Sequence, residues 1–148
     1  MKLAGKHVLN APPPRIWTIL MDTQSLARVV PGISSLEKIS DTSYKSTLNI
    51  GLGPVSGSFT GHIQLDNIVE GKSFTLKAKQ ESKIGNASAS IDIHLVPAGE
   101  SQTTIDFDGI VQLSGLMASM GQRIIGGVSG TLTRQFFKNL EKELEVPG

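Results

Sequence analysis

The chain has 148 residues, of which 39% are hydrophobic and 18% are charged, and its formal net charge is +1. This length is sufficient for one domain with a full core, so we expect a single domain over residues 1–148. Basic and acidic residues are interspersed, which excludes the strongly basic surface that nucleic-acid binding requires. The absence of cysteine excludes disulfides, thiolate nucleophiles and cysteine-ligated metals.

The sequence contains no stretch of 18 apolar residues, and no continuous apolar run precedes Pro12. We therefore expect neither a membrane-spanning helix nor a signal peptide. Together with the lack of cysteine, this favours a cytoplasmic protein, and the most that it leaves for the membrane is peripheral contact at the inner face.

The chain begins with a weakly alternating segment, Met1–Asn10, which predicts a strand. The segment APPPRIWTILMD follows and predicts a helix, because proline is favoured in a first helical turn. A second short helix is expected over Thr23–Val29. It ends before Pro31 because the residue preceding a proline avoids the helical conformation.

Between Ile33 and Val111 the apolar residues recur with a period of two. Such alternation predicts strands with one apolar and one polar face, as in a half-buried antiparallel sheet. The runs are separated by turn sequences with glycine and proline or asparagine: GLGP, EGK, IGN and PAGE. With the first strand, we predict seven strands joined as successive hairpins.

Helical spacing returns at Ser114 and continues to Val146, which predicts one long helix. Its apolar stripe comprises Leu116, Met117, Met120, Ile124, Val128, Leu132, Phe136 and Leu140. The helix also contains five glycines, Gly115, Gly121, Gly126, Gly127 and Gly130, each costing roughly 1 kcal/mol relative to alanine. Two explanations remain open: the glycines permit close packing, or they leave room for a ligand beside the flexible methionines.

The predicted order is therefore a strand, two helices, six strands and one long helix. This order indicates an α+β fold in which a curved sheet has one apolar face and the long helix covers it. A curved sheet that holds one helix often leaves a hydrophobic cavity between them.

Few residues in this pattern offer catalytic chemistry. His62 and His94 occupy polar positions of their strands, so we expect both to face solvent. His7 shares a face with apolar residues and is either a core histidine with a hydrogen-bond partner or a group directed at a ligand. The acidic residues Asp92 and Asp106 lie at polar positions, which argues against a pair of catalytic carboxylates.

No known catalytic motif or clustered set of metal ligands is present. We therefore predict no metal, no cofactor and no catalytic residue. The polar residues expected to face inward are His7, Tyr44, Ser46 and Gln80. This inventory is typical of a cavity that binds a largely apolar molecule and orients it with one or two hydrogen bonds.

The candidate ligand-binding residues share an expected position on the inner face of the sheet or on the apolar stripe of the helix. They are His7, Tyr44, Leu48, Ile50, Phe59, Ile63, Phe74, Leu76, Ile91, Ile93, Phe107, Met117, Met120 and Ile124. For the apolar members, an ordinary core position is the alternative interpretation. Trp17 is expected to serve packing.

Three segments resemble the CoxG family of carbon monoxide dehydrogenase subunits: NAPPPRIWTILMDTQSLARVVPGISSLEKI, GPVSGSFTGHIQL and GLMASMGQRIIGGVSGTLTRQFFKNLEKEL. That family belongs to the START/Bet v 1-like (SRPBCC) superfamily of helix-grip folds, and the resemblance extends over essentially the whole chain. It implies a non-catalytic accessory protein that binds a quinone- or lipid-like ligand. It also implies association with a molybdenum-containing CO dehydrogenase or related hydroxylase and a role in recruiting that enzyme to the membrane.

Two other classes of function remain open. The chain is either a cyclase- or dehydratase-type enzyme of the same fold, with His7 and Tyr44 as its polar groups, or an interaction module whose interior is filled. A fold alone does not decide among these.

Overall fold

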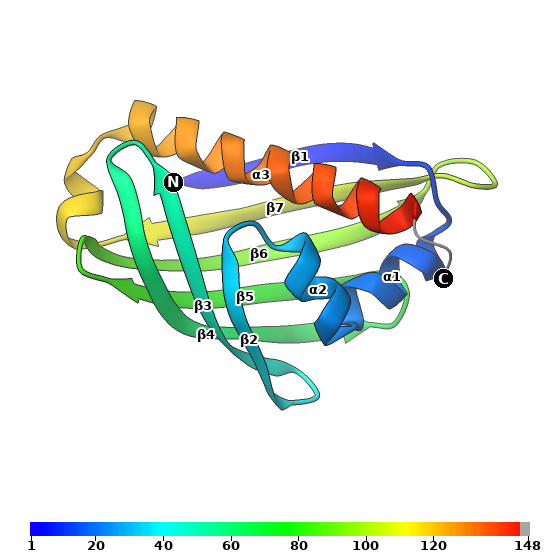
Figure 1. Cartoon of the computed structure of the whole chain (residues 1–148). Helices are drawn as coiled ribbons and strands as arrows, with labels where there is room; N and C mark the ends of the chain where they lie inside the picture. The colour runs from blue at the N-terminus through cyan, green and yellow to red at the C-terminus, as the bar shows by residue number, and fades with distance from the viewer. Residues whose placement is uncertain (146–148) are drawn as a thin grey trace.

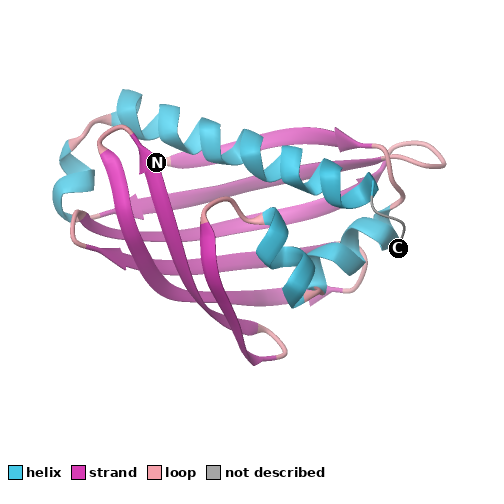
Figure 2. Ribbon diagram, viewed as in Figure 1, coloured by secondary structure: helices cyan, strands magenta, loops and turns pink. Residues whose placement is uncertain are grey.

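The computed structural model describes residues 1–145 of the chain. Seven strands form a single sheet, and the helices lie against one of its sides (Figures 1 and 2). The strands are β1 (Lys2–Leu9), β2 (Ile33–Ser40), β3 (Ser43–Leu52), β4 (Val55–Val69), β5 (Ser73–Ser82), β6 (Gly85–Pro97) and β7 (Thr103–Leu113). The helices are α1 (Pro13–Met21), α2 (Thr23–Val29), the short 3-10 helix η1 (Gly115–Ser119) and α3 (Gln122–Glu145).

The strand order is β1-β7-β6-β5-β4-β3-β2, and all neighbouring strands are antiparallel. The seven strands and their hairpin connections are therefore confirmed. The first strand completes the sheet by pairing with the last. Figure 1 shows that the sheet is strongly curved and that α3 crosses its concave side.

The two short helices form where the sequence predicts them. Pro13 and Pro14 occupy the first turn of α1, and the apolar side of α1 is buried. The Asp22 side chain caps α2 by accepting a hydrogen bond of 3.0 Å from the Ser25 amide, as is typical of helix N-termini. Hydrogen bonds from the Ser25 hydroxyl and amide lower the pKa of the Asp22 carboxyl below its usual value.

The C-terminal segment differs from the prediction of one helix. It forms η1 first, and α3 begins only at Gln122. The physical reason is the backbone at Gly115 and Gly121, whose φ angles of +67° and +84° are left-handed values that glycine adopts most readily. The predicted helix end at Val146 lies outside the described residues.

This break changes which side of the helix is buried. Ile125, Phe137 and Leu140 are buried in α3, whereas Ile124 is 41% exposed and Leu116 is 59% exposed. The prediction that Ile124 and Leu116 face the sheet is therefore wrong. An uninterrupted helix from residue 114 would have kept the predicted stripe in one register, but the left-handed turn at Gly121 resets it.

The buried apolar residues form two clusters. The large cluster lies where α1, α2 and the C-terminal half of α3 meet the sheet, and the small cluster lies beside η1 and the start of α3. The buried members of the large cluster are Leu9, Ala11, Ile16, Trp17, Ile19, Leu20, Leu26, Val29, Tyr44, Ile63, Leu65, Phe74, Leu95, Ile105, Phe137 and Leu140. Those of the small cluster are Val55, Phe59, Met117 and Ile125.

Polar contacts also hold the C-terminal half of α3. Glu143 accepts hydrogen bonds from the Arg28 guanidinium, at 2.6 Å from Nη2 and 3.0–3.1 Å from Nε. The Asn139 amide donates to the Val29 carbonyl at 3.1 Å. These contacts join α3 to the end of α2.

Candidate functional site

The concave face of the sheet carries an apolar area that neither cluster covers. Leu3, Ala89, Ile91 and Val111 are apolar, half-buried and absent from both clusters. They are close neighbours, because Ala89 pairs with Val111 and Ile91 pairs with Gly109, which in turn pairs with Leu3. We call these four residues and Gly109 the open strip.

A pocket of about 560 Å³ adjoins the open strip. It lies between the start of β1, the end of β7, η1 and the start of α3. Its lining consists of Met1, Val111, Gln112, Leu113, Met117, Ala118, Gly121, Gln122 and Ile125. The volume and the mainly apolar lining are typical of sites for small molecules. Val111 belongs to both the pocket and the open strip, so the two form one continuous candidate site.

The lengths of the strands explain the position of this pocket. In the pairing of β1 with β7, Lys2 lies opposite Ile110, so β7 continues for three residues beyond the start of the paired region. The Met1 ammonium group donates to the Val111 carbonyl at 2.9 Å. Beyond that point no strand covers the edge of β7 within the described part of the chain, and the left-handed turn at Gly121 leads the chain from η1 into α3 above it.

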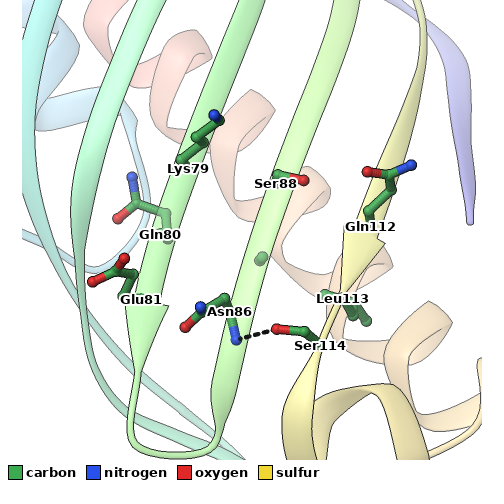
Figure 3. A pocket seen from close by; sticks show the side chains of 9 residues that line it. Lys79, Gln80, Glu81, Asn86, Ser88, Gln112, Leu113 and Ser114 are labelled. Atoms are coloured by element: carbon green, nitrogen blue, oxygen red, sulfur yellow. Dashed lines mark hydrogen bonds between the residues drawn. The ribbon is translucent and has the colours of Figure 1, made fainter.

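A second pocket, of about 340 Å³, lies where β5, β6 and β7 come to an end near η1. Figure 3 shows its lining, with Lys79, Ser88 and Gln112 on three neighbouring strands. The Asn86 amide donates to the Ser114 hydroxyl at 3.2 Å beside them. Most of its lining residues are polar, which fits an apolar ligand less well than the first pocket does.

The structure divides the candidate residues predicted from the sequence. Six belong to or pack against the large cluster: Tyr44, Ile63, Phe74, Leu76, Ile93 and Phe107. Five belong to or pack against the small cluster: Leu48, Ile50, Phe59, Met117 and Met120. Ile91 lies on the open strip, His7 lies on β1, and Ile124 faces outward. Of all these residues, Met117 alone lines the 560 Å³ pocket, and neither described pocket is lined by Phe59, Ile91 or Met120.

Several residues of the pocket were not predicted. Val111 and Leu113 continue the alternation of the last strand, so a longer reading of that pattern would have found them. Ile125 was missed because one uninterrupted helix places Ile124 inward instead. Met1 and Ala118 have no sequence signal, since only the folded chain brings the first strand and η1 together.

His7 faces the concave side and has partners in the protein. Its Nε2 lies 2.7 Å from Glu141 Oε1, and its ring stacks on Phe137 with centroids 4.3 Å apart. The imidazole thus joins β1 to α3. The interpretation of His7 as a histidine with a hydrogen-bond partner is the one that these contacts support.

The remaining polar predictions are resolved by burial. His62 and His94 are exposed, as predicted. Tyr44 is 1% exposed, within the large cluster, and four strands of the sheet order separate its strand from that of His7. Ser46 and Gln80 are buried on the concave face, and Gln80 Nε2 donates to Ser46 Oγ at 3.0 Å.

Within residues 1–145, no group of three or more histidine, aspartate or glutamate side chains is arranged to hold a metal ion. The same residues include no helix whose length and hydropathy would allow it to cross a membrane.

Comparison with solved structures gives the relationships of this fold. A conserved protein from Geobacillus kaustophilus is 30% identical, with a TM-score of 0.95 over 98% of this chain and 95% of that one. A START superfamily protein from Mycobacterium smegmatis is 14% identical, with a TM-score of 0.74 over 97% of each chain. The protein Ara h 8.0201 is 16% identical, with a TM-score of 0.70 over 99% of each chain. The latter two likenesses concern the fold alone.

A search of curated proteins found no match. The model of the CoxG family, which is described as a family of carbon monoxide dehydrogenase subunits, matches residues 5–145. The fold is the START/Bet v 1-like helix-grip fold, as the sequence resemblance implied. The chain therefore belongs to the CoxG family of carbon monoxide dehydrogenase subunits.

Proposed function

We propose that this protein binds a hydrophobic, quinone- or lipid-like molecule on the concave side of its sheet and serves a molybdenum-containing CO dehydrogenase-type enzyme as an accessory protein. The observation that carries the first part is the continuity of the 560 Å³ pocket with the open strip. Apolar side chains that remain accessible beside a pocket favour binding of an apolar molecule. The enzyme partner is proposed from the family description alone.

The surface around the pocket supports exchange of this ligand with a membrane. Leu116 and Ile124 are 59% and 41% exposed in the two helices that line the pocket. Residues 112–135 contain Arg123 and Arg134 and no acidic residue. Exposed apolar side chains with nearby cations favour contact with an anionic lipid surface.

Binding is tested by adding a decyl-substituted benzoquinone to the purified protein and measuring affinity by titration calorimetry. Ala118→Trp places a large ring at an exposed position of the pocket lining and should weaken binding at least tenfold. Ala4→Trp changes an exposed alanine of β1 that lines neither pocket and should leave the affinity unchanged. A wild-type protein that carries no lipid after purification and binds no quinone would instead support the interaction module.

Membrane contact is tested by sedimentation with vesicles of phosphatidylcholine, with and without phosphatidylglycerol. The double variant Leu116→Ser, Ile124→Ser should lose binding to the anionic vesicles. The control variant Val8→Ser, Ile110→Ser removes side chains of similar exposure, 53% and 54%, from the outer side of the sheet. Equal loss in both variants, or no vesicle binding by the wild type, would contradict membrane exchange at this end.

Association with the enzyme is tested by size-exclusion chromatography of this protein mixed with a purified CO dehydrogenase-type hydroxylase. Elution of the two proteins as one complex is expected. Separate elution both with and without the quinone would remove this part of the proposal.

The geometry favours binding over the cyclase- or dehydratase-type enzyme. That alternative requires His7 and Tyr44 to act on one substrate. His7 instead contacts Glu141 and Phe137, Tyr44 is packed in the large cluster, and neither lines a described pocket.

A further inference from the structure

The concave face carries one buried polar pair, Ser46 and Gln80, in a row of otherwise small or apolar residues. The register across the sheet places Ser46 opposite Gly61, Gly61 opposite Gln80, Gln80 opposite Ala87, and Ala87 opposite Leu113. Ser46 is 1% exposed and Gln80 is 8% exposed. The row therefore leads from a buried polar pair to Leu113, which lines the 560 Å³ pocket.

Gly61 is the residue that allows this pair to form. A Cβ atom at position 61 would lie 1.7 Å from the Lys79 carbonyl oxygen and 2.9 Å from the Gln80 Cα, so the backbone excludes any side chain there. With no side chain between them, Gln80 on β5 reaches across β4 to Ser46 on β3 at 3.0 Å. Figure 3 shows Gln80 leaving β5 on the side of β4.

The pair leaves one acceptor without a partner. Gln80 Oε1 is the single buried side-chain oxygen or nitrogen atom of the described residues that has no hydrogen bond. Other buried polar groups are satisfied: the Thr103 hydroxyl, for example, donates to the Ala11 carbonyl at 2.7 Å. Buried polar groups are almost always paired, and an unpaired one destabilises a fold. An amide retained in this state indicates a group that receives its partner from outside the chain.

The surroundings of the pair favour a ligand as that partner. The nearest inward positions on β5 and β6 carry only methyl groups, at Ala78, Ala87 and Ala89. All three alanines are half-buried, so no large side chain of the sheet fills the area beside Gln80. Leu113 lies two strands from Gln80, which corresponds to about 10 Å at the usual strand spacing, a length that an elongated molecule in the pocket can span.

We propose that Gln80 Oε1 accepts a hydrogen bond from a hydroxyl on the head of the bound amphiphile, so that the site selects hydroxyl-bearing heads over heads that only accept. The class of ligand is an alkylphenol, a hydroquinone or a similar alcohol with an apolar tail. This inference rests on the proposed function, because it names the polar group of the molecule that the concave site binds. The Ser46 contact holds the amide with its oxygen free for the ligand.

The test compares 4-nonylphenol with its methyl ether, which has the same tail and lacks the donor. Titration calorimetry should show that the wild type binds the phenol about tenfold more tightly than the ether, a ratio typical of one buried hydrogen bond. Gln80→Met has a similar shape without the acceptor and should bind both probes equally. Gln64→Met, a change on the same sheet outside this row, should keep the tenfold preference.

A second variant keeps the proposal testable if Gln80→Met does not fold. Ser46→Ala frees the Gln80 Nε2 group to donate to the ether oxygen, so the preference for the phenol should shrink severalfold. Equal affinities of the wild type for both probes, or tighter binding of the ether, would overturn this inference while leaving the proposed function intact. Binding of decylbenzoquinone but of neither probe would also overturn it, and binding of none of the three would overturn both.

Discussion

The two ends of this molecule use the same elements, a curved sheet and helix α3, in opposite ways. At one end, the large cluster contains sixteen buried residues and unites α1, α2, the sheet and the C-terminal half of α3. At the other end, the small cluster contains four buried residues, the chain turns at two glycines with positive φ, and Leu116 and Ile124 are exposed.

This difference indicates a division between stability and binding. Dense packing fixes one end of α3, and the open end keeps apolar surface and a pocket accessible. Local stability follows the density of buried contacts, so opening of the structure should begin at η1 and the start of α3. The same end carries the candidate site, which is where ligand exchange requires the chain to move.

The strongest test of this division compares two buried apolar residues of α3. Leu140→Ala should destabilise the protein by about 3–5 kcal/mol, because Leu140 is 0% exposed within the large cluster and its loss leaves a closed cavity. Ile125→Ala should cost only about 2 kcal/mol, since Ile125 already lines an open pocket. Urea denaturation of both variants measures the two values, and equal losses would argue against two unequal ends.

The glycines of the C-terminal segment give opposite expected effects. Gly121→Ala should destabilise by about 1 kcal/mol, because a φ of +84° is unfavourable for a residue with a Cβ atom. Gly126→Ala should stabilise by up to about 1 kcal/mol through helix propensity, since a Cβ there would meet no atom within 4 Å. Thermal unfolding of the two variants checks the signs, and a destabilised Gly126→Ala would mean that this glycine serves packing after all.

The Arg28–Glu143 pair should add a pH-dependent part to the stability of the densely packed end. Hydrogen bonds from Arg28 lower the pKa of Glu143 below its ordinary value of 4.5. The folded state therefore binds this proton less readily than the unfolded state, so the stabilisation is fully present above pH 4.5 and is lost as the pH falls through the lower folded-state pKa.

Thermal unfolding between about pH 7 and pH 3 tests this contribution. Glu143→Gln should lower the melting temperature at neutral pH and narrow its gap to the wild type as the pH decreases. Glu81→Gln changes an exposed carboxylate that forms no ion pair within the described part of the chain, and its melting curve should run parallel to that of the wild type. A constant gap for Glu143→Gln would show that this pair contributes nothing through its charge.

The smallest effect is expected at Ile124. Ile124→Ala should change the free energy of unfolding by no more than about 0.5 kcal/mol, as is usual for exposed positions, although Ile124 adjoins Ile125 in the sequence. Chemical denaturation measures this value beside that of Ile125→Ala. A large loss for Ile124→Ala would restore the single-helix register that the sequence favours.

Most of the fold was accessible to sequence reasoning because it depends on local periodicity. The alternation from Tyr44 to Ile50 and the turn residues between strands predict the antiparallel sheet, and the prolines predict the start of α1. The glycine-rich segment was misjudged at Gly121, since a glycine is compatible with both a helix and a left-handed turn. The glycines at 126 and 127 gave two interpretations, close packing and ligand room, yet both are exposed with no atom within 4 Å of an added Cβ.

The sequence by itself determined the order of elements, the inward position of Ser46 and Gln80, and the outward position of His62 and His94. These features follow from the alternation of side chains along a strand, which is local. Tertiary structure alone decided which apolar residues form core and which remain accessible, and it brought Met1, Val111 and Ile125 together around one pocket. It also left Gln80 Oε1 without a partner, because the pairing of a buried group depends on strands that are distant in the chain.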